Sequence, residues 1–207
     1  MSVSENLINS KLWFAAARHD RRALDALLRE EIYAGACFHA QQCVEKAIKG
    51  ILVACDVPLP KSHSIGDLVD KLPPFPDGLS GDALKTLRQS AKLDRLYLPT
   101  RYPDATISQK PIDEAFDLED AISAKNLANR SYKLLADWAL QLHVPLPEAL
   151  EHDFLNDMRL DVHDDGTVAG TVIIHHGQEM LPNEEAAILR KTQKPHSSQN
   201  PLGDEET

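Results

Sequence analysis

The sequence predicts an all-α fold, an antiparallel bundle of four to five helices over residues 1–145. Apolar residues recur at three- and four-residue steps through long segments without proline, and prolines stand between these segments. The 207 residues, 43% of them hydrophobic, suit one bundle with an appendage. After residue 156 the pattern alternates, which predicts a linker and β-hairpin over residues 146–182. Residues 183–207 should form a short helix and a disordered acidic tail.

The first predicted helix covers residues 7–28. Its apolar stripe steps by three and four residues through Trp13, Ala16, Ala17, Leu24, Leu27 and Leu28. Asp20 falls on the same stripe, which is unusual for a carboxylate. Because a bundle core tolerates a buried charge only when it is paired, we expect a partner for Asp20.

The second predicted helix covers residues 32–55. Its buried stripe comprises Cys37, Ala40, Val44, Ile48, Ile51 and Cys55. A second line on this helix, Phe38, Gln42, Glu45 and Lys49, has the same spacing. We therefore expect a polar row beside the buried stripe.

Two shorter helices should follow. Ser62 or Ser64 can cap a helix that ends near Leu72, before a run of prolines. A fourth helix fits residues 80–98, with Leu84, Leu87, Ala91, Leu98 and either Leu93 or Asp94 in step.

The last helix should run over residues 113–142. It follows Pro111, and Asp113, Glu114 and Asp117 lie at its start, where the helix dipole favours anions. Just before it, Pro99 and Pro103 bracket residues 100–102, which should be extended because residues before proline avoid the helical region.

The charge of the chain is unevenly distributed. The net charge is −10, but residues 1–145 carry 18 basic and 19 acidic side chains, whereas residues 146–207 carry 4 and 13. Free DNA binding is therefore not expected, because the tail would repel it and the body as a whole attracts it weakly. A local basic pocket on the near-neutral body stays compatible with these numbers.

The sequence favours a cytoplasmic protein. No apolar run is long enough to cross a bilayer, and the first residues carry no basic-then-apolar leader. The cysteines, Cys37, Cys43 and Cys55, lie in one predicted helix, where a disulfide framework does not easily form.

Three segments, taken in order, carry a resemblance to a known family. They are residues 38–49 (FHAQQCVEKAIK), residues 63–65 with Leu68 (HSI…L), and Leu96-Tyr97 leading into residues 100–105 (TRYPDA). Together these segments resemble the HEPN family of helical domains, over roughly residues 7–142. The resemblance implies a bundle that is commonly dimeric and is linked to nucleotide or RNA chemistry. Many members are ribonuclease toxins or partners of minimal nucleotidyltransferases.

The ribonuclease branch of that family uses an Arg followed, after four to six residues, by a His. The imidazole can move a proton while the guanidinium stabilises charge on the phosphate. Arg101 matches the Arg, but Thr106, Ile107 and Ser108 occupy the three candidate His positions. The sequence therefore resembles a branch that binds rather than cuts.

The candidate ligand-binding residues are Arg101, Tyr102, Asp104, Tyr97, Gln42, Glu45 and Lys49. In a functional interpretation, Arg101 holds a phosphate, Tyr97 or Tyr102 stacks on a base, and the polar row faces Arg101 as a pocket wall. In a structural interpretation, the row is a solvated or interhelical face, and Arg101 bridges to Asp20, Glu45 or Asp94. Both interpretations stay open at this point.

The histidines offer weaker candidates. His63 and His39 are the catalytic candidates if the chain is an enzyme, although His63 is more simply a residue at a helix start that packs against the second helix. A metal site from His163, His175 and His176 has little support, since no carboxylate spacing accompanies it. We therefore expect no metal and no cofactor.

Our leading hypothesis is a cytoplasmic, homodimeric HEPN-type protein, without a membrane segment, in a prokaryotic toxin–antitoxin or defence setting. It would bind a nucleotide or RNA near Arg101, or a partner nucleotidyltransferase. One alternative is an endoribonuclease toxin with a non-standard base, His63 or His39. Another is a non-catalytic interaction or scaffold protein.

Overall fold

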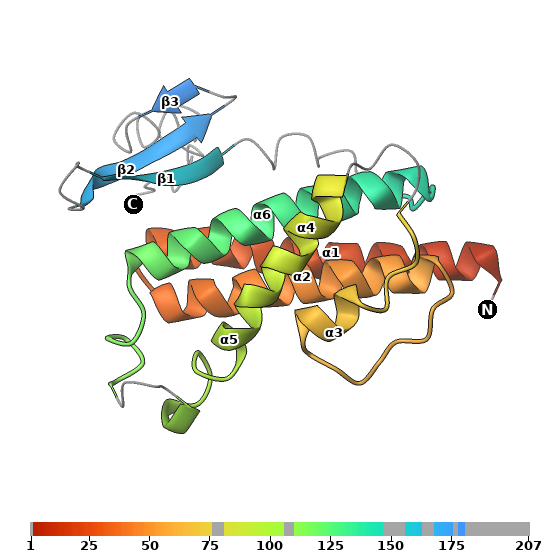
Figure 1. Cartoon of the computed structure of the whole chain (residues 1–207), viewed down its shortest axis with the longest axis horizontal. Coiled ribbons are helices and arrows are strands. Elements are labelled where there is room, and N and C mark those ends of the chain that lie inside the picture. Colours follow the sequence, from red (N-terminus) through yellow and green to blue (C-terminus); the bar gives the residue numbers. More distant parts are fainter. Residues whose placement is uncertain are drawn as a thin grey trace, which may run out of the picture.

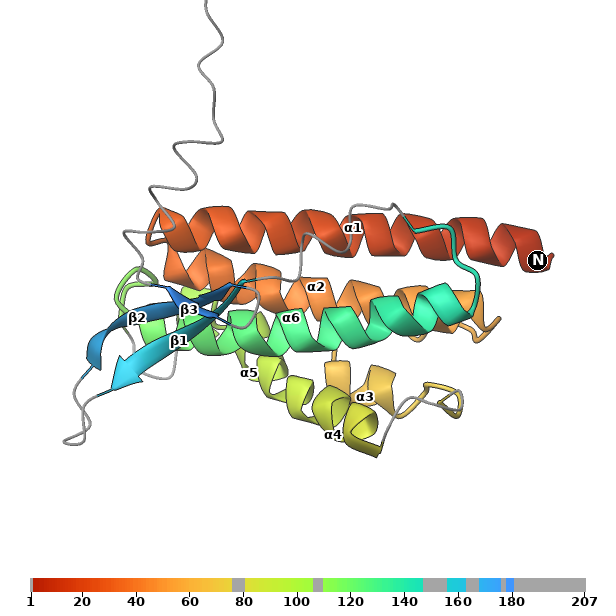
Figure 2. The same cartoon turned by 90° about the horizontal axis from the view of Figure 1, so that it is seen from above.

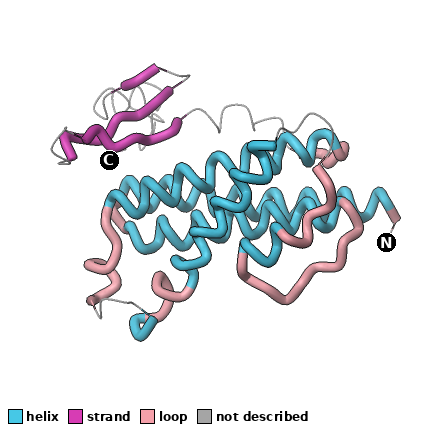
Figure 3. Tube along the Cα trace, in the orientation of Figure 1, coloured by secondary structure: helices cyan, strands magenta, loops and turns pink. Residues whose placement is uncertain are grey.

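The computed structural model describes residues 2–75, 81–105, 110–146, 156–162, 168–175 and 178–180. Its main body is helical (Figure 3). Three long helices, α1 (Val3–Arg29), α2 (Tyr33–Ala54) and α6 (Leu118–Gln141), carry most of the core. Between α2 and α6 the chain forms α3 (Ile65–Val69), α4 (Gly81–Ser90) and α5 (Asp94–Tyr97), with short 3-10 helices at Ala91–Leu93 (η1) and Pro103–Ala105 (η2). The helical fold class is as predicted.

The helix α2 is the centre of the body. In Figures 1 and 2, α1 lies against one side of α2 and runs antiparallel to it, while α4 crosses on the far side from α1. The helix α6 runs in the same direction as α2, so the bundle is not antiparallel throughout. The reason is that α4 and α5 lead the chain back to the end where α2 begins, and α6 starts from there.

Close approach of α1 and α2 depends on Gly50. The backbone carbonyl of Gly50 accepts a hydrogen bond of 2.8 Å from the Ser10 hydroxyl. A Cβ on Gly50 would lie 2.7 Å from the Phe14 ring, which is itself buried and packs edge-on against Tyr132 of α6. Glycine therefore lets the three long helices pack at this point.

The predicted fourth helix is broken in the structure. Residues 80–98 form α4, η1 and α5, so the described residues hold six α-helices rather than four to five. The break places Asp94 beside the start of α3, where its carboxylate accepts hydrogen bonds from the N–H groups of Ile65 (2.7 Å) and Gly66 (3.1 Å). Since a helix start leaves N–H groups without partners, the Asp94 carboxylate caps α3. Helix periodicity alone does not predict this long-range contact.

Two other predictions at the local level were wrong. Residues 100–102 form a turn rather than an extended segment, because the N–H groups of Arg101 and Tyr102 both donate to the carbonyl of Leu98. The last helix starts at Leu118 rather than residue 113, because Asp117 is its N-cap and forms a capping box with Asp120.

Three strands follow the helical body: β1 (Asn156–Val162), β2 (Val168–His175) and β3 (Gln178–Met180). They pair antiparallel in the order β1-β2-β3, one strand more than the predicted hairpin. The predicted helix and acidic tail, residues 183–207, lie outside the described residues.

Candidate functional site

The buried carboxylate of Glu45 on α2 collects four donors. Its Oε1 accepts hydrogen bonds from Lys49 Nζ (2.7 Å) and His63 Nδ1 (3.0 Å), and its Oε2 accepts from Gln41 Nε2 (3.2 Å) and Gln42 Nε2 (3.1 Å). Glu45 is 3% exposed. We call these five residues the Glu45 network. The predicted polar row is therefore mostly buried within the body rather than solvated.

His63 joins this network to the surface. Because a carboxylate only accepts, the His63 ring donates through Nδ1, and its Nε2 is then the acceptor in the neutral form. The side chain is 56% exposed and its ring stacks on Tyr97 with the centroids 5.3 Å apart. His63 therefore packs against α2, as predicted, and also presents an oriented imidazole to solvent.

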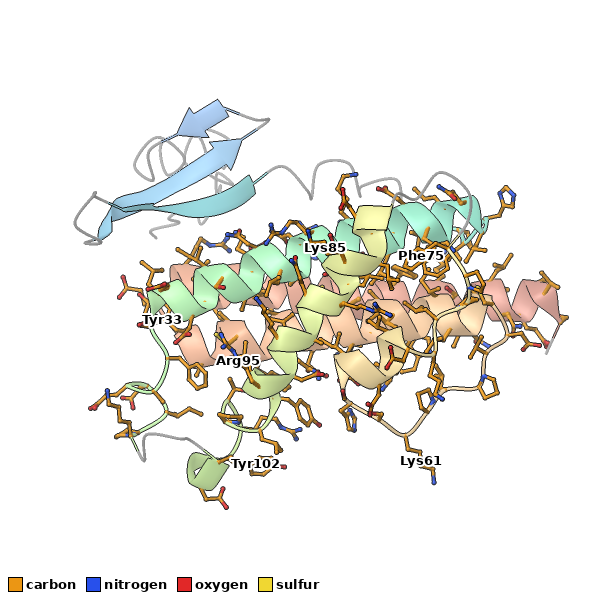
Figure 4. All side chains as sticks on the ribbon, in the orientation of Figure 1. Tyr33, Lys61, Phe75, Lys85, Arg95 and Tyr102 are labelled. Carbon is orange, nitrogen blue, oxygen red and sulfur yellow. The ribbon has the colours of Figure 1, made fainter. Side chains whose placement is uncertain are left out.

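Arg101 also contacts Tyr97. Its Nη1 donates a hydrogen bond of 2.8 Å to the Tyr97 hydroxyl. Its guanidinium carbon lies 5.1 Å from the Tyr97 ring centroid, 5.3 Å from that of Tyr102 and 5.7 Å from that of Phe38. All three distances are within cation–π range. We call these four residues the Arg101 cluster; Figure 4 shows Tyr102 just beyond α5.

The structural interpretation of Arg101 is wrong in its partners. Among the described residues, no carboxylate forms an ion pair with Arg101. Glu45 is occupied by its network, and Asp94 by the start of α3. Asp20 is buried and paired, as expected, but with His39 Nδ1 (2.9 Å) and Lys46 Nζ (2.5 Å) of α2.

The pairing of Asp20 sets its ionisation. Burial raises the pKa of this carboxyl, but the hydrogen bonds and charges of His39 and Lys46 outweigh it, so the net pKa lies below its ordinary value. Asp20 therefore stays ionised at neutral pH. His39 is hydrogen-bonded to Asp20, and its ring packs edge-on against Phe38 of the Arg101 cluster.

The other predicted residues differ in whether they contact Arg101. Tyr97 and Tyr102 touch Arg101, whereas Gln42, Glu45 and Lys49 reach it only through His63 and Tyr97. Asp104 lies in η2, exposed, and makes no hydrogen bond or ion pair with another described residue. The direct pocket wall expected from the polar row is therefore not formed against Arg101.

Two residues of the site were not among the predicted ligand-binding residues. Phe38 lies under the Arg101 guanidinium, and Gln41 also donates a 2.9 Å hydrogen bond to the carbonyl of His63. Both had a signal in the sequence, since Phe38 begins the polar line of the second helix and Gln41 stands four residues before Glu45.

Neither a metal site nor a membrane span is found in the part of the chain that the structure describes. No group of three or more His, Cys, Asp or Glu side chains is placed to hold a metal ion there. None of the described helices combines the length and apolarity needed to span a bilayer.

Comparison with known proteins identifies the class. The model of the HEPN domain matches residues 10–138, and the chain belongs to the HEPN domain family. The match covers α2, His63, the Arg101 cluster and nearly all of α6.

Three relatives are each similar over nearly two thirds of this chain. The structure of TT1696 from Thermus thermophilus is 33% identical, with a TM-score of 0.50, over 63% of this chain and 98% of that one. ST0689, an archaeal HEPN homologue, is 27% identical, with a TM-score of 0.50, over 63% of this chain and 97% of that one. A Methanocaldococcus jannaschii protein named "Putative toxin MJ1304" is 23% identical over 64% of this chain and 90% of its own length.

Proposed function

We propose that this HEPN-domain protein binds a nucleotide at the Arg101 cluster and works as part of a toxin–antitoxin or defence system. The observation that supports binding is the state of Arg101. Its guanidinium is exposed, lies among three aromatic rings, and is neutralised by no carboxylate among the described residues. A guanidinium in this state can bind a phosphate through paired N–H groups while a neighbouring ring stacks on a base.

A titration with ATP and with GTP tests the proposal. We expect saturable binding, by calorimetry or tyrosine fluorescence, that weakens about tenfold or more in Arg101→Ala. Arg130→Ala is the matched control, because Arg130 is an exposed arginine on α6 whose Nε donates to the carbonyl of Asn126. Absence of binding at millimolar nucleotide, or equal loss in both variants, would overturn the proposal.

The toxin setting is supported by family membership and by the name of the M. jannaschii relative. A nucleotidyltransferase partner is the corresponding proposal for the antitoxin. Co-expression of the chain with a nucleotidyltransferase encoded beside it should relieve growth arrest, and the two chains should co-purify. If expression of the chain alone leaves growth unchanged, the toxin setting is wrong and a scaffold role is favoured.

A second function, endoribonuclease activity, is favoured by one observation. The Nδ1 of His63 is held by a buried carboxylate, so its Nε2 is oriented to exchange a proton beside the ring that Arg101 also contacts. Cleavage of cellular RNA after induction should be lost in His63→Ala and kept in His19→Ala, an exposed histidine on α1. Intact RNA after induction of the unmodified chain would contradict this function.

A further inference from the structure

Four basic side chains form a line along α4, η1 and α5. They are Lys85, Arg88, Lys92 and Arg95, spaced three, four and three residues apart, and all four are exposed. We call them the basic stripe. Figure 4 labels Lys85 on α4 and Arg95 at α5, the two ends of the stripe. Among the described residues, none of the four forms an ion pair.

The basic stripe lies on the exposed side of the rod that α4 and α5 make. The opposite side of the same rod supplies the buried contacts, through Ala83, Leu87, Leu93 and Leu96. No acidic residue occurs between residues 83 and 93. Like charges three and four residues apart repel each other by a few tenths of a kcal/mol per pair. The chain therefore keeps a mildly unfavourable arrangement on a face that the bundle does not cover.

The shape of the stripe suits an extended polyanion. Its ends lie ten positions apart in the sequence, which is about 15 Å along a helix. Lys85, Arg88 and Lys92 also line a shallow surface hollow of about 420 Å³, together with Leu84 and Gln89. A chain of phosphates, rather than one phosphate group, matches cations distributed over this length.

The stripe leads towards the Arg101 cluster. Arg95 lies on α5, which ends at Tyr97, and the turn after α5 carries Arg101. The row ends at aromatic rings, of which Tyr102 is exposed and Tyr97 and Phe38 are partly buried. A row of cations that ends at accessible aromatic rings is the arrangement by which proteins bind single strands, because only an unpaired base can stack on a side chain. RNA also has the 2′-hydroxyl, which the imidazole of His63 beside the cluster can hydrogen-bond.

We propose that the basic stripe binds the backbone phosphates of a single-stranded RNA, one base of which enters the Arg101 cluster. The proposal rests on the proposed nucleotide site and extends it along α4 and α5. It separates two kinds of contact: the aromatic cluster holds one nucleotide, and the stripe supplies affinity that depends on strand length and on salt.

The test compares two triple variants of equal charge change. One, Lys85→Ala/Arg88→Ala/Lys92→Ala, removes stripe residues; the other, Lys11→Ala/Arg22→Ala/Arg29→Ala, removes exposed cations from α1, on the far side of α2 from α4 (Figure 2). Binding of a short fluorescent oligouridylate is measured by anisotropy between about 50 and 200 mM salt. Each lost phosphate contact lowers the salt slope by about 0.7, so the stripe variant should lose about 2 in slope. Over this salt range the unmodified chain should therefore lose about twentyfold more affinity than the stripe variant, and the α1 variant should behave like the unmodified chain.

The outcomes separate the two proposals. If ATP binds but the oligouridylate binds no more tightly, or if both triple variants change alike, the stripe is not an RNA site while the nucleotide site stands. If neither ligand binds, both proposals fall. Equal binding of oligouridylate, single-stranded DNA and a polyglutamate peptide would identify a non-specific cationic face and also overturn the RNA proposal.

Discussion

Glu45 Oε1 lies 3.0 Å from Nδ1 of His63, and the same oxygen lies 2.7 Å from Nζ of Lys49. One buried carboxylate thus fixes an exposed imidazole and neutralises a buried ammonium. Removing one partner of a buried charge pair costs more than removing both, because the remaining charge stays desolvated.

Glu45→Ala should therefore lower the free energy of unfolding more than Lys49→Met. Without Glu45, the buried Lys49 loses its carboxylate, and a loss of about 3 kcal/mol is expected. Without Lys49, Glu45 still accepts from His63, Gln41 and Gln42. The loss of unfolding free energy in Lys49→Met should therefore be smaller than in Glu45→Ala by at least about 1 kcal/mol. Urea unfolding followed by circular dichroism measures both; a larger loss for Lys49→Met would contradict the assignment.

Asp20 should make stability depend on acid pH. Burial raises its pKa, but His39 and Lys46 together lower it by more than burial raises it, so the folded-state pKa lies below the ordinary value of 3.8. A depressed carboxyl pKa contributes stability that is present above the unfolded value and is lost as pH falls through the folded value. The stability difference between the unmodified chain and Asp20→Asn should thus be largest near pH 6 and shrink below pH 3.8.

Asp137→Asn is the matched control for this measurement. Asp137 is paired with Lys133 on the exposed face of α6, where an ion pair contributes little. Its effect on urea unfolding should be small at every pH. A difference for Asp20→Asn that stays constant down to pH 3 would show that Asp20 is not held by His39 and Lys46.

Gly50→Ala should destabilise the bundle although alanine is the better helix former. Its Cβ would overlap the Phe14 ring, and overpacking of this kind costs about 1–3 kcal/mol. Gly66→Ala is the control, since a Cβ there meets its neighbours at 3.5 Å or more. We expect a clear fall in thermal midpoint for the first variant and little change for the second.

The three thiols should differ in reactivity. Burial raises the pKa of Cys37 to about 12 and also raises that of Cys43, and both side chains have no exposed surface. Cys55, at the end of α2, is half-buried. Burial also raises the pKa of Cys55, so its thiolate fraction is reduced as well, and accessibility is what separates it from the other two. Under native conditions Cys55 should therefore react with a thiol reagent such as DTNB before Cys37 and Cys43, and all three should react in denaturant. Rapid native reaction of all three would mean that the α2 core opens readily.

Helix type and position could be predicted from the sequence because the long helices are amphipathic. The spacing of Cys37, Ala40, Val44, Ile48 and Ile51 places one face of α2 in the core, and the structure agrees. The break at residues 91–93 could not be predicted this way, because it depends on a contact between Asp94 and α3 that lies about 30 residues away in sequence.

The sequence indicated several residues of the candidate site but few of the contacts between them. Arg101 and Tyr97 do lie together, since they are four residues apart across one turn. The partner of Asp20 was missed because Lys46 and His39 belong to another helix, and periodicity gives the face of a helix but not its register against a neighbour. The spacing of Lys85, Arg88, Lys92 and Arg95 was visible in the sequence, whereas its exposure and lack of ion pairs required coordinates.

Asp94 connects the two halves of the site mechanically. Its carboxylate holds the N–H groups of Ile65 and Gly66, which follow His63 closely in the chain, while its own helix ends at Tyr97 and leads into Arg101. The segment that carries His63 and the helix that leads into Arg101 therefore share one support besides Tyr97. Loss of the Asp94 carboxylate would remove that support from the start of α3.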